Sequence, residues 1–231
     1  MTARPRPRPR LRVLTAVAAV CAATATAPLL TGCGEAREPR AAAAPTAGAS
    51  SPHRSPPASR APQRLTEDQA ERKALIGAAK VPWDKAAGTA VAGVGKGRLA
   101  GTELEWARST VGSPSAGPRT PEWVTAVAAE DGTVHTVRVD AVSGRVTESR
   151  VDPGQDRDDK RELSGRLRAA TVTPQRAAGT ATGRKKGTVT AVGLDDARWS
   201  VDVVTTNDWN KTTYDIDART GKVVREHVDR D

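Results

Sequence analysis

Cysteine is scarce in this chain, which has only two among its 231 residues. Cys21 lies within an N-terminal apolar run at 11–30, and Cys33 follows shortly after that run ends. If the run is removed on export, one thiol remains and an internal disulfide is excluded. After Leu30 no stretch approaches the ~18 apolar residues that a membrane-spanning helix needs. The sequence therefore offers no second membrane anchor.

A concentrated basic surface is also absent, although the chain carries a net charge of +9. Five arginines lie within residues 4–12, before and at the start of the apolar run, and residues 33–64 hold five more against two glutamates. Taking these from the 36 basic and 27 acidic residues of the whole chain leaves 26 against 25 from Leu65 onward. A nucleic-acid-binding domain needs a clustered basic face with stacking aromatics. We therefore expect no nucleic-acid partner.

Signatures of catalysis are missing as well. His53, His135 and His227 show no HExxH or other metal-ligand spacing. No Gly-x-Ser-x-Gly elbow and no phosphate-binding loop occurs in the sequence. Asp140 and Asp217 head predicted turns, where hydrogen bonds to turn amides explain them better than acid chemistry does. We therefore expect no catalytic residue, no metal ligand and no cofactor, and we predict that the protein is not an enzyme.

What the sequence does contain begins with an export signal. Arginines stand before the apolar run at 11–30, as in a signal peptide. The run ends in Leu-Thr-Gly-Cys at 30–33, which resembles the lipobox of bacterial lipoproteins. That resemblance implies cleavage after residues 1–32 and attachment of a lipid to the thiol of Cys33, which would hold the protein on the extracytoplasmic face of the cell membrane. The alternatives are a secretory signal cut elsewhere and a retained membrane helix.

Residues 33–64 are rich in Ala, Pro, Ser and Arg and show no apolar periodicity. A segment of this composition cannot bury enough surface to offset the entropy of ordering it. We expect a disordered tether that spans about 30 Å as a flexible coil and holds the folded part away from the membrane.

From residue 65 onward the chain passes twice through one pattern. Three segments recur in the same order: Ala-Ala-Gly-Thr-Ala at 86–90 and 177–181, the tryptophans Trp123 and Trp199, and Val-Asp-Ala-x-Ser-Gly-x-Val at 139–146 with Ile-Asp-Ala-x-Thr-Gly-x-Val at 216–223. Ordered agreement of this kind indicates duplication, with repeats at 65–152 and 158–231. The first copy is longer because of a Ser/Gly/Pro-rich segment at 109–121.

Each repeat is expected to begin with helices and end in strands. Thr66 and Thr173 are candidate N-caps. Apolar residues follow Thr66 at helical spacing, and in the second repeat Leu163, Leu167 and Ala170 precede Thr173. Farther along, apolar and polar residues alternate with a period of two, which predicts strands with one buried face. Tight turns are predicted at Asp131-Gly132, 143–144, 207–210 and 220–221. The predicted fold class is α+β: two tandem repeats, each a helical segment packed on a four-stranded antiparallel sheet.

This order of elements, with its Val-Asp-Ala-x-Ser/Thr-Gly-x-Val ending, resembles PepSY domains across nearly all of residues 65–231. PepSY domains occur in the propeptides of secreted metallopeptidases and in lipoproteins of the cell envelope. The resemblance implies a membrane-anchored module that binds or inhibits an exported peptidase or another envelope protein. The alternative is a structural or sensory envelope lipoprotein that binds cell-wall or ligand components. Fold alone does not decide between them.

The five tryptophans divide into two groups. Trp123 and Trp199 open equivalent strands and are expected in the core. Trp83, Trp106 and Trp209 have no counterpart in the other repeat, so they are the candidates for an exposed recognition surface. We expect Trp106 and the segment at 109–121 to form the contact region.

Overall fold

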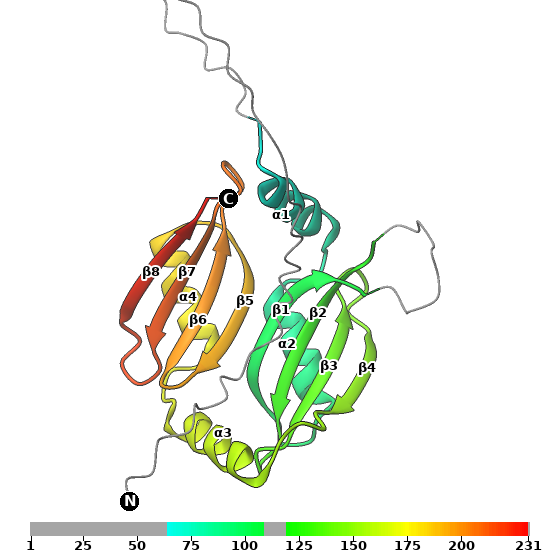
Figure 1. Cartoon of the computed structure of the whole chain (residues 1–231), viewed down its shortest axis with the longest axis vertical. Helices are drawn as coiled ribbons and strands as arrows, with labels where there is room; N and C mark the ends of the chain where they lie inside the picture. Colours follow the sequence, from blue (N-terminus) through cyan, green and yellow to red (C-terminus); the bar gives the residue numbers. More distant parts are fainter. Residues whose placement is uncertain (1–63, 109–118, 231) are drawn as a thin grey trace, which may run out of the picture. The chain divides into compact units, whose positions relative to one another are not determined.

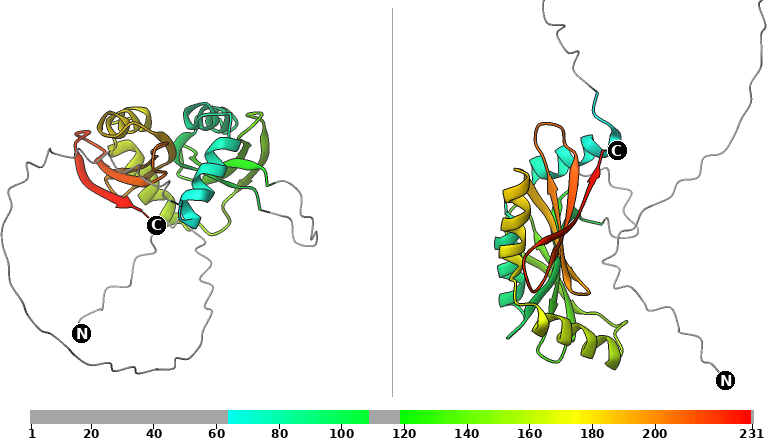
Figure 2. Two further views of the ribbon diagram at one scale, coloured as in Figure 1. Left: turned by 90° about the horizontal axis from the view of Figure 1, so that it is seen from above. Right: turned by 90° about the vertical axis from the view of Figure 1, so that its left-hand side faces the viewer.

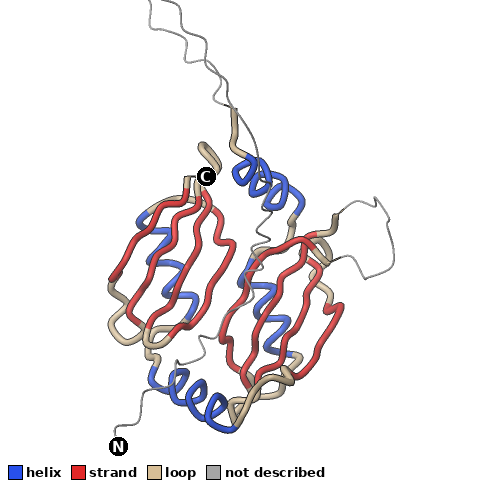
Figure 3. Tube along the Cα trace, viewed as in Figure 1, coloured by secondary structure: helices blue, strands red, loops and turns tan. Residues whose placement is uncertain are grey.

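The structure is a computed structural model that describes residues 64–108 and 119–230. Two helices and four strands follow one another, and the same order then occurs again (Figures 1 and 3). The elements are α1 (Glu67–Ala78), α2 (Trp83–Ala92), β1 (Arg98–Trp106), β2 (Pro121–Ala128), β3 (Val134–Asp140), β4 (Val146–Val151), α3 (Arg157–Ala169), α4 (Pro174–Arg184), β5 (Thr188–Asp195), β6 (Arg198–Val204), β7 (Lys211–Asp217) and β8 (Val223–Asp229).

The strands form one eight-stranded antiparallel sheet in the order β4-β3-β2-β1-β5-β6-β7-β8. The halves join where β1 pairs with β5, in the register Gly101 to Gly193 and Glu103 to Ala191. We call this junction the seam. The predicted α+β class, with helices on antiparallel strands, is confirmed. The sequence pattern did not indicate that the two sheets merge, and the duplication itself stays a prediction.

Helices α2 and α4 cover one face of the sheet, whereas α1 and α3 lie at its opposite ends (Figures 1 and 2). The covering helices contact the strands through alanine, which lets the two backbones approach closely. Ala86, Ala90, Ala177 and Ala181 are fully buried. The helix starts follow the predicted caps: Thr66 forms a capping box with Gln69, and Thr173 accepts from the Arg176 amide with Pro174 in the first turn.

Corresponding residues of the two halves make the same contacts. The indole N–H of Trp123 donates to the Val81 carbonyl, and that of Trp199 donates to the Val172 carbonyl, both at 2.8 Å. Both rings are buried, as predicted. A tryptophan at this position therefore packs against the covering helix and also ties the chain that leads into it.

The final turns also agree between the halves. Asp140 accepts from the amides of Val142 and Ser143, and Asp217 accepts equivalent bonds from its own turn. These amides hold the pKa of each carboxyl below its usual value. Gly144 and Gly221 adopt φ of 75° and 74°, which favours glycine. The turn assignments are thus confirmed, and the aspartates are turn caps.

Gly88 and Gly179, within the recurring Ala-Ala-Gly-Thr-Ala segments, do not lie where their helices approach the sheet. Both are exposed, and a Cβ at either position would meet no atom within 4 Å. Alanine there should therefore raise the free energy of unfolding by about 1 kcal/mol per site, because glycine costs that much inside a helix.

Urea unfolding of Gly88→Ala and Gly179→Ala would measure this gain. The matched control is Gly132→Ala, which should lower stability. Gly132 has φ of 86°, and its Cβ would collide with the Lys160 carbonyl. A loss of stability at Gly88 or Gly179 would contradict the solvent-facing placement of these residues.

The lipidation residue Cys33, the signal at 1–32 and nearly all of the tether at 33–64 lie outside the described residues. So does most of the segment at 109–121. Within residues 64–108 and 119–230, no helix is long and apolar enough to cross a membrane.

Candidate binding surface

The strand alternation places charged side chains and one threonine on the sheet face turned away from α2 and α4. We call this the open face. The strand register places these residues on neighbouring strands, and ion pairs join several of them. They are Glu103, Glu105, Glu122, Arg138, Glu148, Asp202, Lys211, Thr213 and Asp229. The helices that lie over the described sheet are both on its other side (Figure 2).

In the first half, one arginine holds three carboxylates. The Arg138 guanidinium bonds Glu122 and reaches Glu105 at 3.5 Å and Glu148 at 3.2 Å. Arg138 and Glu122 are 13% and 8% exposed, so the pair is largely shielded from water. Burial raises the pKa of Glu122, and the positive charge of Arg138 opposes that rise. This cluster carries more negative than positive charge.

Glu103 lies at the seam. Its β5 neighbour is Ala191, and the next residue across, on β6, is Asp202. Burial raises the pKa of Glu103 to about 7, and the negative charges of Asp202 and Glu105 add to that rise, whereas Lys211 opposes it. No hydrogen bond or ion pair joins the Glu103 carboxyl to another described residue. It is a half-buried acid whose charge is only weakly compensated.

We expect Glu103→Gln to stabilise the protein at about pH 8 and to have little effect at about pH 4. In the folded protein Glu103 keeps its proton up to about pH 7, whereas in the unfolded chain its carboxyl has the ordinary pKa of 4.5. The free energy of unfolding therefore falls as the pH rises from about 4.5 to about 7. Glutamine does not ionise, so the variant does not show this fall. The gain should be about 1 to 2 kcal/mol after allowance for partial exposure. Chemical denaturation across this pH range would test it, and equal stabilities at every pH would contradict the assignment.

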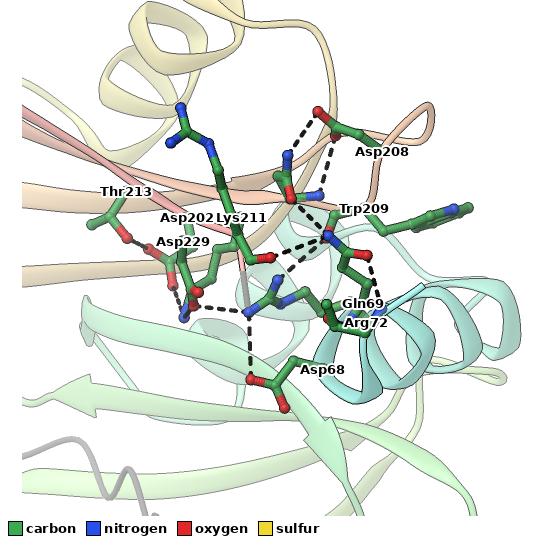
Figure 4. Close-up of polar contacts among 12 residues, drawn as sticks. Asp68, Gln69, Arg72, Asp202, Asp208, Trp209, Lys211, Thr213 and Asp229 are labelled. Carbon is green, nitrogen blue, oxygen red and sulfur yellow. Dashed lines mark hydrogen bonds and ion pairs between the residues drawn. The ribbon is translucent and has the colours of Figure 1, made fainter. Parts of the chain in front are cut away.

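Helix α1 connects to the second half through a polar network at the end of the sheet where α1 lies (Figure 4). Arg72 donates to Asp229 at 2.8 Å and to the Trp209 carbonyl at 3.3 Å. Gln69 donates to the Asn210 side chain at 3.0 Å. α1 has no fully buried residue, and its attachment combines these polar contacts with the packing of Leu75 and Ile76 against the core.

Lys211 extends this network to the seam. Its ammonium lies 3.6 Å from Asp229 and 3.9 Å from Asp202 (Figure 4). Thr213 donates to Asp202 at 2.6 Å. The seam carboxylates and the α1 contacts thus form one connected site.

The candidate tryptophans Trp83, Trp106 and Trp209 are all half-buried, and each lies near α1. Lys73 of α1 lies 5.8 Å from the centre of the Trp209 ring. Arg119, which bonds Glu71 of α1, lies 4.7 Å from that of Trp106. These rings are partly covered from within the chain, so their role in binding a partner stays a prediction.

The buried apolar residues form two clusters, one around Trp123 and one around Trp199, and Trp83 packs against both of these core clusters. It also lines an apolar groove of ≈ 560 Å³ together with Ile76 of α1, Leu104 and Val189. The indole N–H of Trp106 is buried and has no acceptor among the described residues. Trp83 therefore has a structural role at the seam, whereas Trp106 keeps an unused donor.

Glu103, Arg138 and Asp202 were not among the residues predicted from the sequence. Alternation in β1 puts Glu103 and Glu105 on a polar strand face, which was a usable signal. The proximity of Glu103 to Asp202 follows from the pairing of β1 with β5, and no local pattern encodes that pairing. Among the described residues, no group of three or more His, Cys, Asp or Glu side chains could hold a metal ion.

Comparison with known proteins supports part of the family resemblance. Residues 172–227 match the PepSY family, described as the peptidase propeptide and YPEB domain. The match covers α4, β5, β6 and β7 and most of β8, so a PepSY domain is present in the second half. The first half lies outside the matched range, and its assignment stays a prediction.

A crystal structure from Clostridium difficile 630, described as that of a candidate lipoprotein, is similar to this chain. The two are 18% identical, the similarity covers 65% of this chain and 95% of that one, and the TM-score is 0.41. A similarity of this extent carries no argument about function. No curated protein matches the chain.

Proposed function

We propose that this protein is a lipid-anchored, extracytoplasmic module that binds another exported protein and restrains an exported peptidase. The observation that carries the proposal is the PepSY domain at residues 172–227, whose family description includes peptidase propeptides. A propeptide acts by contact with its enzyme, so a module of this kind works through its surface. The resemblance of residues 30–33 to a lipobox supports the anchor at Cys33.

The matching contacts of the two halves support a second PepSY-like unit at 65–152. Trp123 with Val81 repeats the bond of Trp199 with Val172. A protein with two such units in one sheet presents a broad, rigid face. Interfaces of about 800 Å² per partner are typical of stable complexes, and a face of eight strands is large enough for one.

Crosslinking on intact cells followed by affinity capture from membranes tests the binding role. We expect a peptidase among the captured proteins and slower substrate cleavage by that peptidase when the purified protein is added. Recovery of cell-wall or other envelope components without any peptidase, together with no inhibition, would favour the structural or sensory alternative.

The anchor is tested separately with labelled fatty acid. We expect label on the wild-type protein and none on Cys33→Ala, which should also leave the membrane fraction. Label that persists in Cys33→Ala would contradict the anchor without bearing on the binding role.

A further inference from the structure

Small residues line part of the open face along the seam. Gly193 of β5 pairs with Gly101 of β1, and Ala191 pairs with Glu103, so three of these four residues have almost no side chain. A Cβ built on Gly193 would meet no atom within 4 Å. An extended chain could therefore approach β5 at Gly193 without displacing any described side chain.

Carboxylates flank this strip on both sides. Glu103 and Glu105 project from β1, and Asp202 projects from β6. Glu105 shares Arg138 with two other carboxylates, and Asp202 shares Lys211 with Asp229. The Glu103 carboxyl has no hydrogen bond or ion pair within the described part of the chain. The strip therefore carries an excess of negative charge that a cationic ligand would neutralise.

We infer that the open face along the seam binds an extended, lysine- or arginine-rich segment of the partner protein. This inference rests on the proposed binding role and adds to it the surface and the chemistry of the partner. The small residues at Gly101, Ala191 and Gly193 admit a main chain, and the flanking carboxylates accept charge-assisted hydrogen bonds from its side chains. Two strand spacings, about 10 Å, separate Glu103 from Asp202, which equals about three residues of extended chain.

The probe is a short fluorescent peptide in which lysine alternates with threonine, and its binding to the mature chain is followed by anisotropy. We expect saturable binding that weakens with added salt, and no binding of the same peptide with glutamate in place of lysine. Replacement of the seam carboxylates in Glu103→Gln, Glu105→Gln, Asp202→Asn should weaken binding about tenfold or more. The control, Glu67→Gln, Glu130→Gln, Asp158→Asn, removes the same charge from exposed sites elsewhere and should bind like wild type.

A second variant guards against misfolding of the triple substitution. Gly193→Lys puts a positive charge into open space on the strip and should also abolish binding while the circular dichroism spectrum stays unchanged. Equal binding by wild type, the seam variant and Gly193→Lys would overturn the inference. So would binding that appears only after the arginines at 37–64 are neutralised, because the chain's own basic segment would then be the occupant.

Binding should also strengthen as the pH rises through about 7, where Glu103 loses its proton. The titratable and charged groups around Glu103 are Glu105 on β1, Asp202 on β6 and Lys211 on β7, and His227 lies farther along the same row on β8. Loss of this pH response in Glu103→Gln would assign it to Glu103, whereas its persistence would overturn this part of the inference. The peptide assay needs no peptidase, so failure to capture one would count against the proposed function alone.

Discussion

Replacing Trp199 with alanine should lower the free energy of unfolding by about 4 kcal/mol. The ring is 2% exposed, and its indole N–H satisfies the Val172 carbonyl. Alanine would leave a cavity in the core and a buried carbonyl without its donor. Trp123→Ala should cost a similar amount, because that ring is 1% exposed and makes the corresponding bond to Val81.

The same pair of variants tests whether the halves unfold together. β1 pairs with β5, and Trp83 packs against both core clusters, so we expect one cooperative transition in urea for each variant. Far-ultraviolet circular dichroism reports on the whole sheet. Val224→Ala, at a side chain that is 54% exposed, is the control and should change stability by less than about 0.5 kcal/mol. Two separate transitions, only one of them sensitive to each tryptophan, would contradict the single eight-stranded sheet.

Arg138→Met should cost about 3 kcal/mol at neutral pH. Methionine keeps much of the buried stem but removes the positive charge, which leaves Glu122 unpaired at 8% exposure. The loss should shrink as the pH falls, because protonation of Glu122 relieves the unpaired charge. Glu122→Gln combined with Arg138→Met should recover part of the stability for the same reason.

Arg150→Met is the matched control, since Arg150 is 56% exposed and its one ion pair within residues 64–108 and 119–230 is with Glu148, at 3.4 Å. It should cost about 0.5 kcal/mol or less. Denaturation midpoints of the three variants, measured at neutral and acidic pH, give the comparison. A loss for Arg138→Met no greater than that for Arg150→Met would show that the carboxylate cluster does not depend on its arginine.

These two predictions concern different layers of the molecule. Trp199 belongs to the core under the helices, where tight packing makes any cavity costly. Arg138 belongs to the open face, where charge balance decides which groups can stay partly buried. The first layer gives the fold its stability, and the second gives the proposed binding surface its charge.

The sequence by itself determined the local structure. Capping residues at Thr66 and Thr173, alternation in the strands and glycines at the final turns act over a few residues, so the chain carries them in its order. The recurrence of Trp123 as Trp199 was enough to predict that both are core residues. The order of elements and the Val-Asp-Ala-x-Ser/Thr-Gly-x-Val ending predicted a PepSY resemblance across nearly all of residues 65–231, and the match to that family covers residues 172–227 of it.

Only the tertiary structure decided how the halves meet. The pairing of β1 with β5 joins residues about ninety positions apart, and the antiparallel register there follows from the packing of both cores. Because of that pairing, Glu103 is partly buried at the seam with Asp202 two strands away; burial raises its pKa most, and the negative charge of Asp202 adds to the rise. Arg72 of α1 reaches Asp229 across the end of the sheet. Burial and charge proximity depend on distances through space, so the candidate binding surface became visible only in the folded chain.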